Sequence, residues 1–310
     1  MSDKPKTPGT PGTKALYREK FFASQDDLKL YYRDYGDALS ELTPVICLPG
    51  LTRNSKDFHP IASLLSSAEE GGRRVLCADL RGRGLSQRDS NYTNYAVPTY
   101  LGDIQHMAAV AGVERAIFIG TSLGGMISTA MAAARPSLVA GVVLNDIGPE
   151  LDPRGLARIA SYVGKQEALP DWEAAIAAMQ VMYKVAYPDF DDAEWLDIAQ
   201  KTFREDDQGR PAPDYDPDIG TALREATENQ APEDRPDLWA LFGALRDIPL
   251  LGLRGELSDI LASETFARMQ QENPDMAAIE VPNRGHVPKL DEPVCQQAIL
   301  EFVRRVDSKS

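Results

Sequence analysis

Residues 118–125 read FIGTSLGG and place Ser122 between two glycines. An apolar, β-like run at 116–119 leads into this stretch, and a helix-like run at 126–134 follows it. A serine on so sharp a strand-to-helix turn adopts a strained backbone conformation in which flanking side chains would collide, and glycine avoids that collision. The pattern therefore predicts a serine hydroxyl held above a sheet, with the N–H groups of the next helix pointing toward it.

The length and charge of the chain limit its class. Its 310 residues suit one large α/β domain or a domain with an insertion. The net charge of −14, from 33 basic and 47 acidic side chains, argues against nucleic acid and anionic membranes as partners and favours a neutral or apolar substrate. No apolar run approaches the ~18 residues of a membrane span, and the N-terminus lacks the apolar core of a signal peptide.

Residues 1–14 are rich in Lys, Pro, Thr and Gly and are expected to form a flexible leader. The three cysteines, Cys47, Cys77 and Cys295, are few and odd in number, and two of them fall in predicted core strands. This usage predicts buried free thiols and a cytoplasmic location. Cysteine and histidine are nowhere clustered at metal-ligand spacing, so no metal site is predicted.

Short apolar or β-branched runs alternate with helical patterns along most of the chain. This alternation predicts an α/β fold, with a mostly parallel, twisted sheet and helices on both of its faces. Polar and charged residues follow the ends of the strands, where an open α/β sheet carries its functional groups. The predicted strands lie at residues 28–34, 44–48, 74–79, 116–119, 140–144, 248–253 and 278–281.

The regular alternation stops between Pro149 and about Arg246. This stretch is acidic and helical in pattern, has no predicted strand, and contains Pro- and Asp-rich connectors. We therefore expect a helical cap, or lid, at 149–246, inserted into a core formed by 15–148 and 247–310. The helices of the cap are predicted at 154–163, 172–186, 193–203 and 236–245.

A serine hydroxyl is a weak nucleophile at neutral pH and needs a base, which in turn needs an orienting carboxylate. His286 is the candidate base because it lies in a loop directly after the last predicted strand, from which it can reach back over the sheet. His59 and His106 fall in helix-like segments and are expected to be structural.

Three carboxylates are candidates for the orienting acid. Asp259 is preferred because it lies a few residues beyond the strand at 248–253, from where it can curl toward His286. Glu256 is closer to that strand and suits a role in capping the loop. Asp146, at the end of the strand that follows Ser122, is the alternative position.

The order Ser122, Asp259, His286 is the order of the triad in α/β-hydrolases. The chain resembles the α/β-hydrolase fold superfamily from about Leu28 to Val306. Residues 79–86, DLRGRGLS, are similar to its D-x-R-G-x-G-x-S turn, and residues 285–293, GHVPKLDEP, to its G-H-x-P-x-L-x-x-P segment. The resemblance implies a serine-nucleophile, esterase- or lipase-like hydrolase with a helical cap and no cofactor.

The resemblance also implies an oxyanion hole formed by the backbone N–H groups of Leu51 and Leu123. Pro49 stands where many members of the family have His, a departure that leaves the backbone donor in place. The cap is expected to set specificity, since it roofs the site. The candidate substrate-binding residues are Arg53, Tyr100, Met182, Tyr183 and Trp239.

The resulting expectation is a carboxylic ester hydrolase that acts with water on a small, largely apolar ester or lactone. Ser122 argues against epoxide hydrolases and haloalkane dehalogenases of this fold, which use Asp at the same turn. Val287 and the loop 51–53 match the pattern of C–C bond hydrolases poorly, and cofactor-free perhydrolases share the whole triad. These two enzyme classes and a hydrolase-like small-molecule receptor are the alternatives, and the sequence leaves the oligomeric state open.

Overall fold

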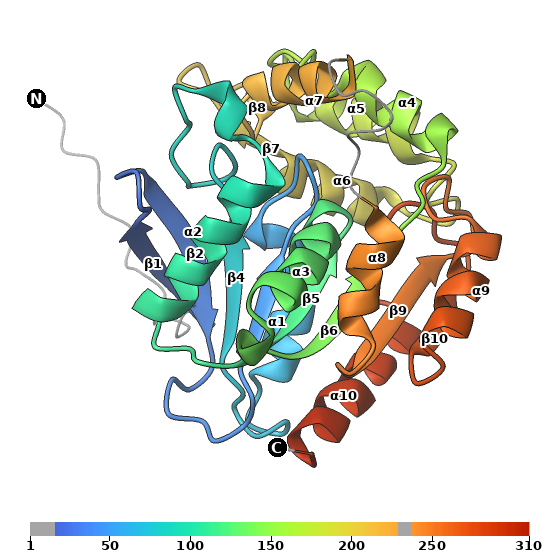
Figure 1. Cartoon of the computed structure of the whole chain (residues 1–310). Helices are drawn as coiled ribbons and strands as arrows, with labels where there is room; N and C mark the ends of the chain where they lie inside the picture. The colour runs from blue at the N-terminus through green and yellow to red at the C-terminus, as the bar shows by residue number, and fades with distance from the viewer. Residues whose placement is uncertain (1–15, 229–236, 310) are drawn as a thin grey trace, which may run out of the picture.

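The computed structural model describes residues 16–228 and 237–309, so the predicted leader at 1–14 lies outside the described residues. An eight-stranded sheet forms the centre, in the order β1-β2-β4-β3-β5-β6-β9-β10 (Figure 1). β1 and β2 are antiparallel to their neighbours, and the pairs from β4 to β10 are parallel. The predicted α/β fold with a mostly parallel sheet is therefore confirmed. The strands are β1 (Tyr17–Ala23), β2 (Lys29–Tyr35), β3 (Val45–Leu48), β4 (Val75–Asp79), β5 (Ala116–Thr121), β6 (Val139–Asn145), β9 (Leu250–Gly255) and β10 (Ala277–Val281).

The four inner strands β3 to β6 are buried along their whole length. Their sequences, VICL, VLCAD, AIFIGT and VAGVVLN, are nearly continuous apolar runs, as is usual for parallel strands that helices cover on both faces. The edge strand β1 reads YREKFFA, and most of its side chains are exposed. It was missed in the sequence because a solvent-facing edge strand needs no apolar run.

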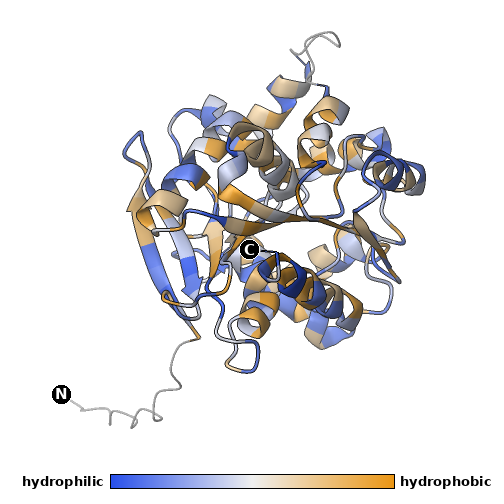
Figure 2. Ribbon diagram, turned by 60° about the horizontal axis from the view of Figure 1, so that its bottom comes forward, coloured by the Kyte–Doolittle hydropathy of each residue, from blue (hydrophilic) through white to orange (hydrophobic). Residues whose placement is uncertain are grey.

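Helices cover both faces of the sheet, which Figure 2 shows edge-on between two helical layers. Alternate residues of a strand serve the two layers: Ile46 and Leu48 pack with one group of helices, and Val45 and Cys47 with the other. The first group is α2 (Val97–Val110), α3 (Leu123–Ala134), α8 (Leu238–Phe242) and α9 (Ser263–Glu272), and the second is α1 (His59–Leu65) and α10 (Pro293–Asp307). Short 3₁₀ turns lie at η1 (Ser55–Phe58), η2 (Tyr92–Asn94), η3 (Pro136–Leu138) and η5 (Gly243–Leu245).

Several helices lie between β6 and β9 in the chain, and most of them gather above one end of the sheet (Figure 1). The segment also contains a two-stranded sheet, so the prediction that it holds no strand is wrong. Its last helix, α8, packs beside α3 and buries Phe242 in the core. The division into a core and a cap remains a prediction. The other elements are α4 (Pro153–Tyr162), α5 (Trp172–Tyr183), α6 (Asp192–Thr202), β7 (Phe203–Glu205), β8 (Pro211–Pro213) and α7 (Asp218–Glu228).

The acidic connectors of this segment begin its helices. The side chains of Asp152, Asp171 and Asp191 each accept a hydrogen bond from a backbone N–H in the first turn of α4, α5 and α6. Such caps satisfy N–H groups that have no partner within the helix. The segment also has a small apolar core of its own, in which Met179, Trp195 and other side chains of α5 and α6 meet.

Cys47, Cys77 and Cys295 are free and buried, which confirms the prediction of buried thiols. Within residues 16–228 and 237–309, every helix is too short or too polar to cross a bilayer.

Candidate active site

Ser122 lies at the turn between β5 and α3, with φ of 51° and ψ of −115°. A positive φ is strained for a residue with a side chain, and such strain is found mainly at functional sites. The chain passes closely on both sides of the serine, since a Cβ added at Gly120 would overlap the backbone of Gly124, and one at Gly124 would overlap the carbonyl of Leu48. The glycines are therefore required for the turn, as the sequence predicts.

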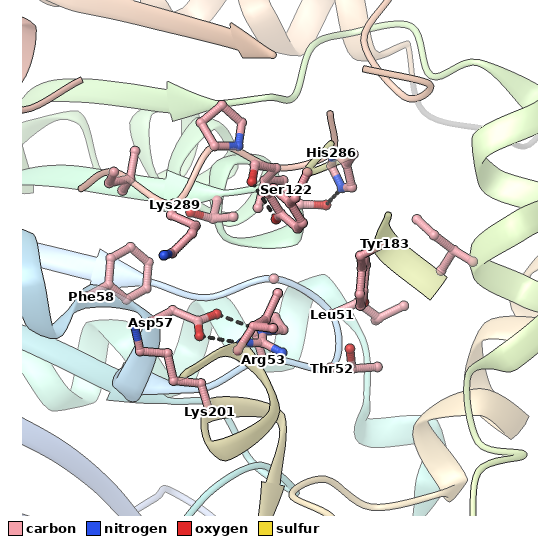
Figure 3. Close-up of a pocket in the computed structure, with 18 of the residues that line it drawn as sticks. Leu51, Thr52, Arg53, Asp57, Phe58, Ser122, Tyr183, Lys201, His286 and Lys289 are labelled. Atoms are coloured by element: carbon pink, nitrogen blue, oxygen red, sulfur yellow. Dashed lines mark hydrogen bonds and ion pairs between the residues drawn. The ribbon is translucent and has the colours of Figure 1, made fainter. Parts of the chain in front are cut away.

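His286, in the loop after β10, lies between Ser122 and Asp146. Its Nε2 is 3.0 Å from Oγ of Ser122, and its Nδ1 is 2.7 Å from Oδ2 of Asp146. A carboxylate only accepts hydrogen bonds, so Nδ1 carries the proton and Nε2 of the neutral ring accepts from the serine hydroxyl. Three side chains from separate parts of the chain thus form one hydrogen-bonded series, of which Figure 3 shows Ser122 and His286.

The carboxylate of Asp146 is fully buried and held from several sides. Its Oδ1 accepts from the backbone N–H of Gly255 at 2.9 Å, and its Oδ2 also accepts from Oγ of Ser258 at 2.6 Å. In the sheet, β6 lies between β5 and β9. The residue that follows β6 is therefore close both to Ser122, which follows β5, and to the loop after β9. The position of Asp146 is thus fixed by backbone and side-chain donors independently of His286.

The prediction that Asp259 orients His286 is wrong. Both oxygens of Asp259 bind the guanidinium of Arg158 on α4, at 2.6 and 2.8 Å. Partial burial raises the pKa of Asp259, but the Arg158 guanidinium outweighs it and holds that pKa below its usual value. Glu256 accepts a hydrogen bond from the backbone N–H of Asn283 and so holds the loop after β10 that leads to His286. Its role in capping its own loop remains a prediction.

The two predicted oxyanion donors lie on either side of Ser122. Leu123 is the first residue of α3, so its N–H has no acceptor within the helix. Leu51 follows Gly50, where an added Cβ would be 3.7 Å from Cβ of Ser122, so the chain at Gly50 passes beside the serine. The oxyanion role of Leu51 and Leu123 remains a prediction.

Arg83 holds the loop that carries Leu51. This arginine is fully buried, and its Nε donates to the carbonyl of Leu51 at 2.6 Å. Its other nitrogens donate to the carbonyl of Arg81 at 2.8 Å and to the hydroxyl of Tyr100 at 3.1 Å. Arg83 could not be chosen from the sequence, because it occupies an unspecified position of the D-x-R-G-x-G-x-S turn.

Ser122 and His286 open into a cavity of about 880 Å³, a volume that includes space open to solvent (Figure 3). The floor comes from the loops after β3 and β5 and from residues 286–290, and the roof from α4, α5 and α6. Arg53 and Tyr183, both predicted to bind substrate, are in its wall. The lining residues are Gly50, Leu51, Thr52, Arg53, Asp57, Phe58, Thr121, Ser122, Ile159, Tyr162, Val163, Tyr183, Tyr187, Asp197, Ile198, Lys201, His286, Val287, Pro288, Lys289 and Leu290.

Three other predicted substrate contacts lie elsewhere. Tyr100 is buried beneath the loop, where it accepts from Arg83. Met182 lines a separate, shallow hollow between α4 and α5. Trp239 donates to Glu150 at 2.6 Å and lines another hollow together with Phe242 and Arg246. These predictions are wrong because the sequence cannot tell which face of each helix meets the cavity.

The loop of His286 is also fastened to the segment above the sheet. The N–H of Gly285 donates to the carbonyl of Ala186 at 2.7 Å, and the hydroxyl of Tyr187 donates to the carbonyl of Val287 at 2.7 Å. Burial raises the pKa of Tyr187, so its hydroxyl keeps its proton. Tyr187 could not be predicted from the sequence, because its role depends on a contact across 100 residues of chain.

His59 and His106 lie away from the cavity. Nδ1 of His59 is 3.0 Å from the hydroxyl of Tyr35, and His106 packs near the ring of Phe22. Their structural role agrees with the expectation from the sequence.

Known proteins are similar to this chain in sequence and in fold. A model of the alpha/beta hydrolase fold matches residues 43–166. A 3-hydroxybutyrate-oligomer hydrolase of Cupriavidus necator is 31% identical over 268 residues, which cover 86% of this chain and 89% of the relative. The chain belongs to the α/β-hydrolase family.

Other members of the family agree over most of their length. The crystal structure of an alpha/beta hydrolase from Novosphingobium aromaticivorans has a TM-score of 0.86 and 41% identity, covering 94% of this chain and 99% of that one. A 2-(acetamidomethylene)succinate hydrolase of Mesorhizobium japonicum is 29% identical over 82% of this chain and 85% of its own. This α/β-hydrolase is therefore a hydrolytic enzyme.

Proposed function

We propose that the enzyme cleaves carboxylic esters through an acyl-enzyme, with Ser122 as nucleophile, His286 as general base and Asp146 as the orienting acid. The observation that carries the proposal is the hydrogen-bonded series from Asp146 through His286 to Ser122 at the floor of the cavity. Base, nucleophile and orienting carboxylate in hydrogen-bond reach are what nucleophilic catalysis by serine requires.

In the first half of the reaction, Oγ of Ser122 attacks the ester carbonyl carbon while Nε2 of His286 takes the hydroxyl proton. Asp146 stabilises the imidazolium that forms and keeps the proton of Nδ1 in place. His286 then donates its proton to the leaving alkoxide, and an acyl-enzyme remains on Ser122. In the second half, His286 activates water in the same way, and the acid is released.

The negative charge that develops on the carbonyl oxygen needs donors already in place. The N–H groups of Leu51, which lines the cavity, and of Leu123, the first residue of α3, would supply them together with the N-terminal end of α3. One donor of this kind typically changes kcat by about 10²- to 10³-fold.

The relative from Cupriavidus necator supports a substrate class. Its name states that it hydrolyses oligomers of 3-hydroxybutyrate, and hydroxy acids in such oligomers are joined by ester bonds. Since the two chains align over most of their length, we propose esters of short hydroxy acids as substrates of this enzyme.

The test begins with labelling by a fluorophosphonate and continues with p-nitrophenyl esters of increasing acyl length. Ser122→Ala should lose both labelling and turnover while its circular dichroism spectrum and Tm stay close to wild type. Ser263→Ala, on an exposed serine at the start of α9, is the matched control and should keep both. Turnover that survives in Ser122→Ala would refute the proposal, and a single turnover by wild type would favour a small-molecule receptor instead.

A further inference from the structure

The wall of the cavity carries more positive than negative charge, although the chain as a whole is strongly acidic. The basic side chains are Arg53, Lys201 and Lys289, and the acidic ones are Asp57 and Asp197. The three basic side chains are only 15, 16 and 15% exposed. Charges so far removed from water keep much of their strength toward a bound anion.

The basic residues differ in how fully they are paired. Arg53 makes two hydrogen bonds to Asp57, at 2.8 and 2.6 Å, and a third to Thr202. Nζ of Lys201 is 2.7 Å from Asp197. These two cations are therefore neutralised by near partners.

Lys289 has the loosest partners of the three. Its Nζ is 3.1 Å from Asp291 and 3.8 Å from Asp197, and Asp197 already holds Lys201 more closely. Both of these carboxylates are substantially exposed, so water weakens their hold on the amine. Its Nζ also lies 4.9 Å from the centre of the Phe190 ring, a contact that does not neutralise the charge. Lys289 is thus the cation of the wall that carboxylates hold least closely.

The position of Lys289 suits a ligand that reacts at Ser122. It follows His286 by three residues in the same segment and lines the same cavity as Ser122, with its amine on the side of Phe58 and Asp57 (Figure 3). The wall near α4 is apolar instead, because Ile159 and Val163 face the cavity there. A substrate that spans the cavity meets an apolar side and a cationic side.

We propose that Lys289, with Lys201 beside it, binds a carboxylate of the substrate, so that the enzyme acts on esters that keep one free carboxyl group. An ester-linked hydroxy acid with its own carboxylate is such a molecule. The proposal rests on the ester hydrolysis proposed above, and it replaces the neutral substrate expected from the net charge of the chain. The charge at the cavity decides whether an anionic substrate is preferred, because salt at ordinary concentration screens the effect of charges that lie farther away than about 10 Å.

The experiment compares monoethyl with diethyl esters of succinic, glutaric and adipic acids, with ethanol release as the readout. Both members of a pair present the same kind of ethyl ester, but the diethyl ester has a second ester in place of the carboxylate, so kcat/KM is compared per scissile bond. Wild type should prefer the monoethyl ester in kcat/KM. Lys289→Met should lower the ratio of the two efficiencies by about 10- to 100-fold, mainly through KM, as expected for a hydrogen bond to a charged group.

Two variants make the comparison specific. Lys289→Arg keeps the charge and should retain part of the preference. Lys184→Met removes the same charge from an exposed position after α5 and should leave both efficiencies unchanged. A wild-type enzyme that hydrolyses diethyl esters at least as well as monoethyl esters would overturn the carboxylate site while leaving ester hydrolysis intact, and so would an equal loss on both esters in Lys289→Met.

A binding measurement tests the site independently of turnover. Monoethyl glutarate should bind to Ser122→Ala in calorimetry, and the added Lys289→Met change should weaken its Kd by the same 10- to 100-fold. Unchanged affinity in the double variant refutes the carboxylate site. Absence of both labelling and ester turnover in wild type refutes the proposed function, so the two failures are distinct.

Discussion

Replacing Asp146 by Asn tests whether Asp146 or Asp259 is the carboxylate that orients His286. Asn keeps the shape of the side chain, and its Oδ1 can still accept from the N–H of Gly255, while its nitrogen takes the place of Oδ2 beside Ser258 and His286. Its amide N–H₂ would face Nδ1 of His286 and make that nitrogen an acceptor. The ring proton would then move to Nε2, which could no longer take the proton of Ser122.

The size of this effect follows from the burial of the pair. Asp146 is fully buried, so water cannot replace its charge or its hydrogen bond to His286. The same substitution in a Ser-His-Asp triad of another serine hydrolase lowers kcat by about 10⁴-fold through the wrong tautomer. We expect a loss of about 10³- to 10⁴-fold in kcat, which corresponds to about 4 to 5.5 kcal/mol of activation free energy.

Asp259→Asn is the matched control, because it makes the same chemical change at the rejected position. Its partner Arg158 is partly exposed, and an ion pair of this kind contributes about 0 to 1 kcal/mol to stability. We expect kcat to remain within about tenfold of wild type in p-nitrophenyl ester hydrolysis. If Asp146→Asn kept more than a tenth of wild-type kcat, or if Asp259→Asn lost as much as Asp146→Asn, the assignment of the acid would be refuted.

Three further substitutions test the scaffold of the site. Gly124→Ala should lower the free energy of unfolding by about 1 to 3 kcal/mol, and Tm with it, because the new methyl group meets the backbone of β3. An unchanged denaturation curve would contradict this close packing. Arg83→Met should lower kcat more than it raises KM, because it frees the carbonyl of Leu51, and equal effects on both would argue against a role in holding that loop. The Arg81 guanidinium lowers the pKa of Asp26 to about 2, so this carboxylate stabilises the fold above about pH 4 and loses its effect as pH falls through 2. Asp26→Asn should therefore make acid unfolding shallower between pH 4 and 2, and an unchanged slope would count against the pair.

The sheet was predictable because its inner strands are buried on both faces and read as unbroken apolar runs. The turn at Ser122 was predictable for a local reason, since its strain requires glycine at fixed neighbouring positions. His286 was predictable for another local reason, since it lies in the loop that follows the last strand. Each of these features is encoded within a few residues of chain.

The choice between Asp146 and Asp259 was not encoded locally. Both aspartates follow strand ends, and the deciding contacts come from far along the chain: Gly255 is 109 residues from Asp146, and Arg158 is 101 residues from Asp259. The wall of the cavity was unpredictable for the same reason. The sequence does not distinguish Tyr100 from Tyr183. Tyr100 packs under Arg83, whereas Tyr183 lines the same cavity as Ser122.

Because Asp146, after β6, is the carboxylate beside His286, Asp259 in the loop after β9 is available for another role. This loop holds α4 at three points: Asp259 binds Arg158, the carbonyl of Asp259 lies against Gly155 with no room for a Cβ, and the carbonyl of Ile260 accepts from the N–H of Asp152 at 2.9 Å. α4 in turn supplies part of the cavity roof. Loosening this attachment would disturb substrate contacts while the series from Asp146 to Ser122 stays in place. The small loss expected for Asp259→Asn should therefore be found mainly in KM, whereas the loss for Asp146→Asn should be found in kcat, and this contrast distinguishes a residue that positions the roof from one that acts on His286.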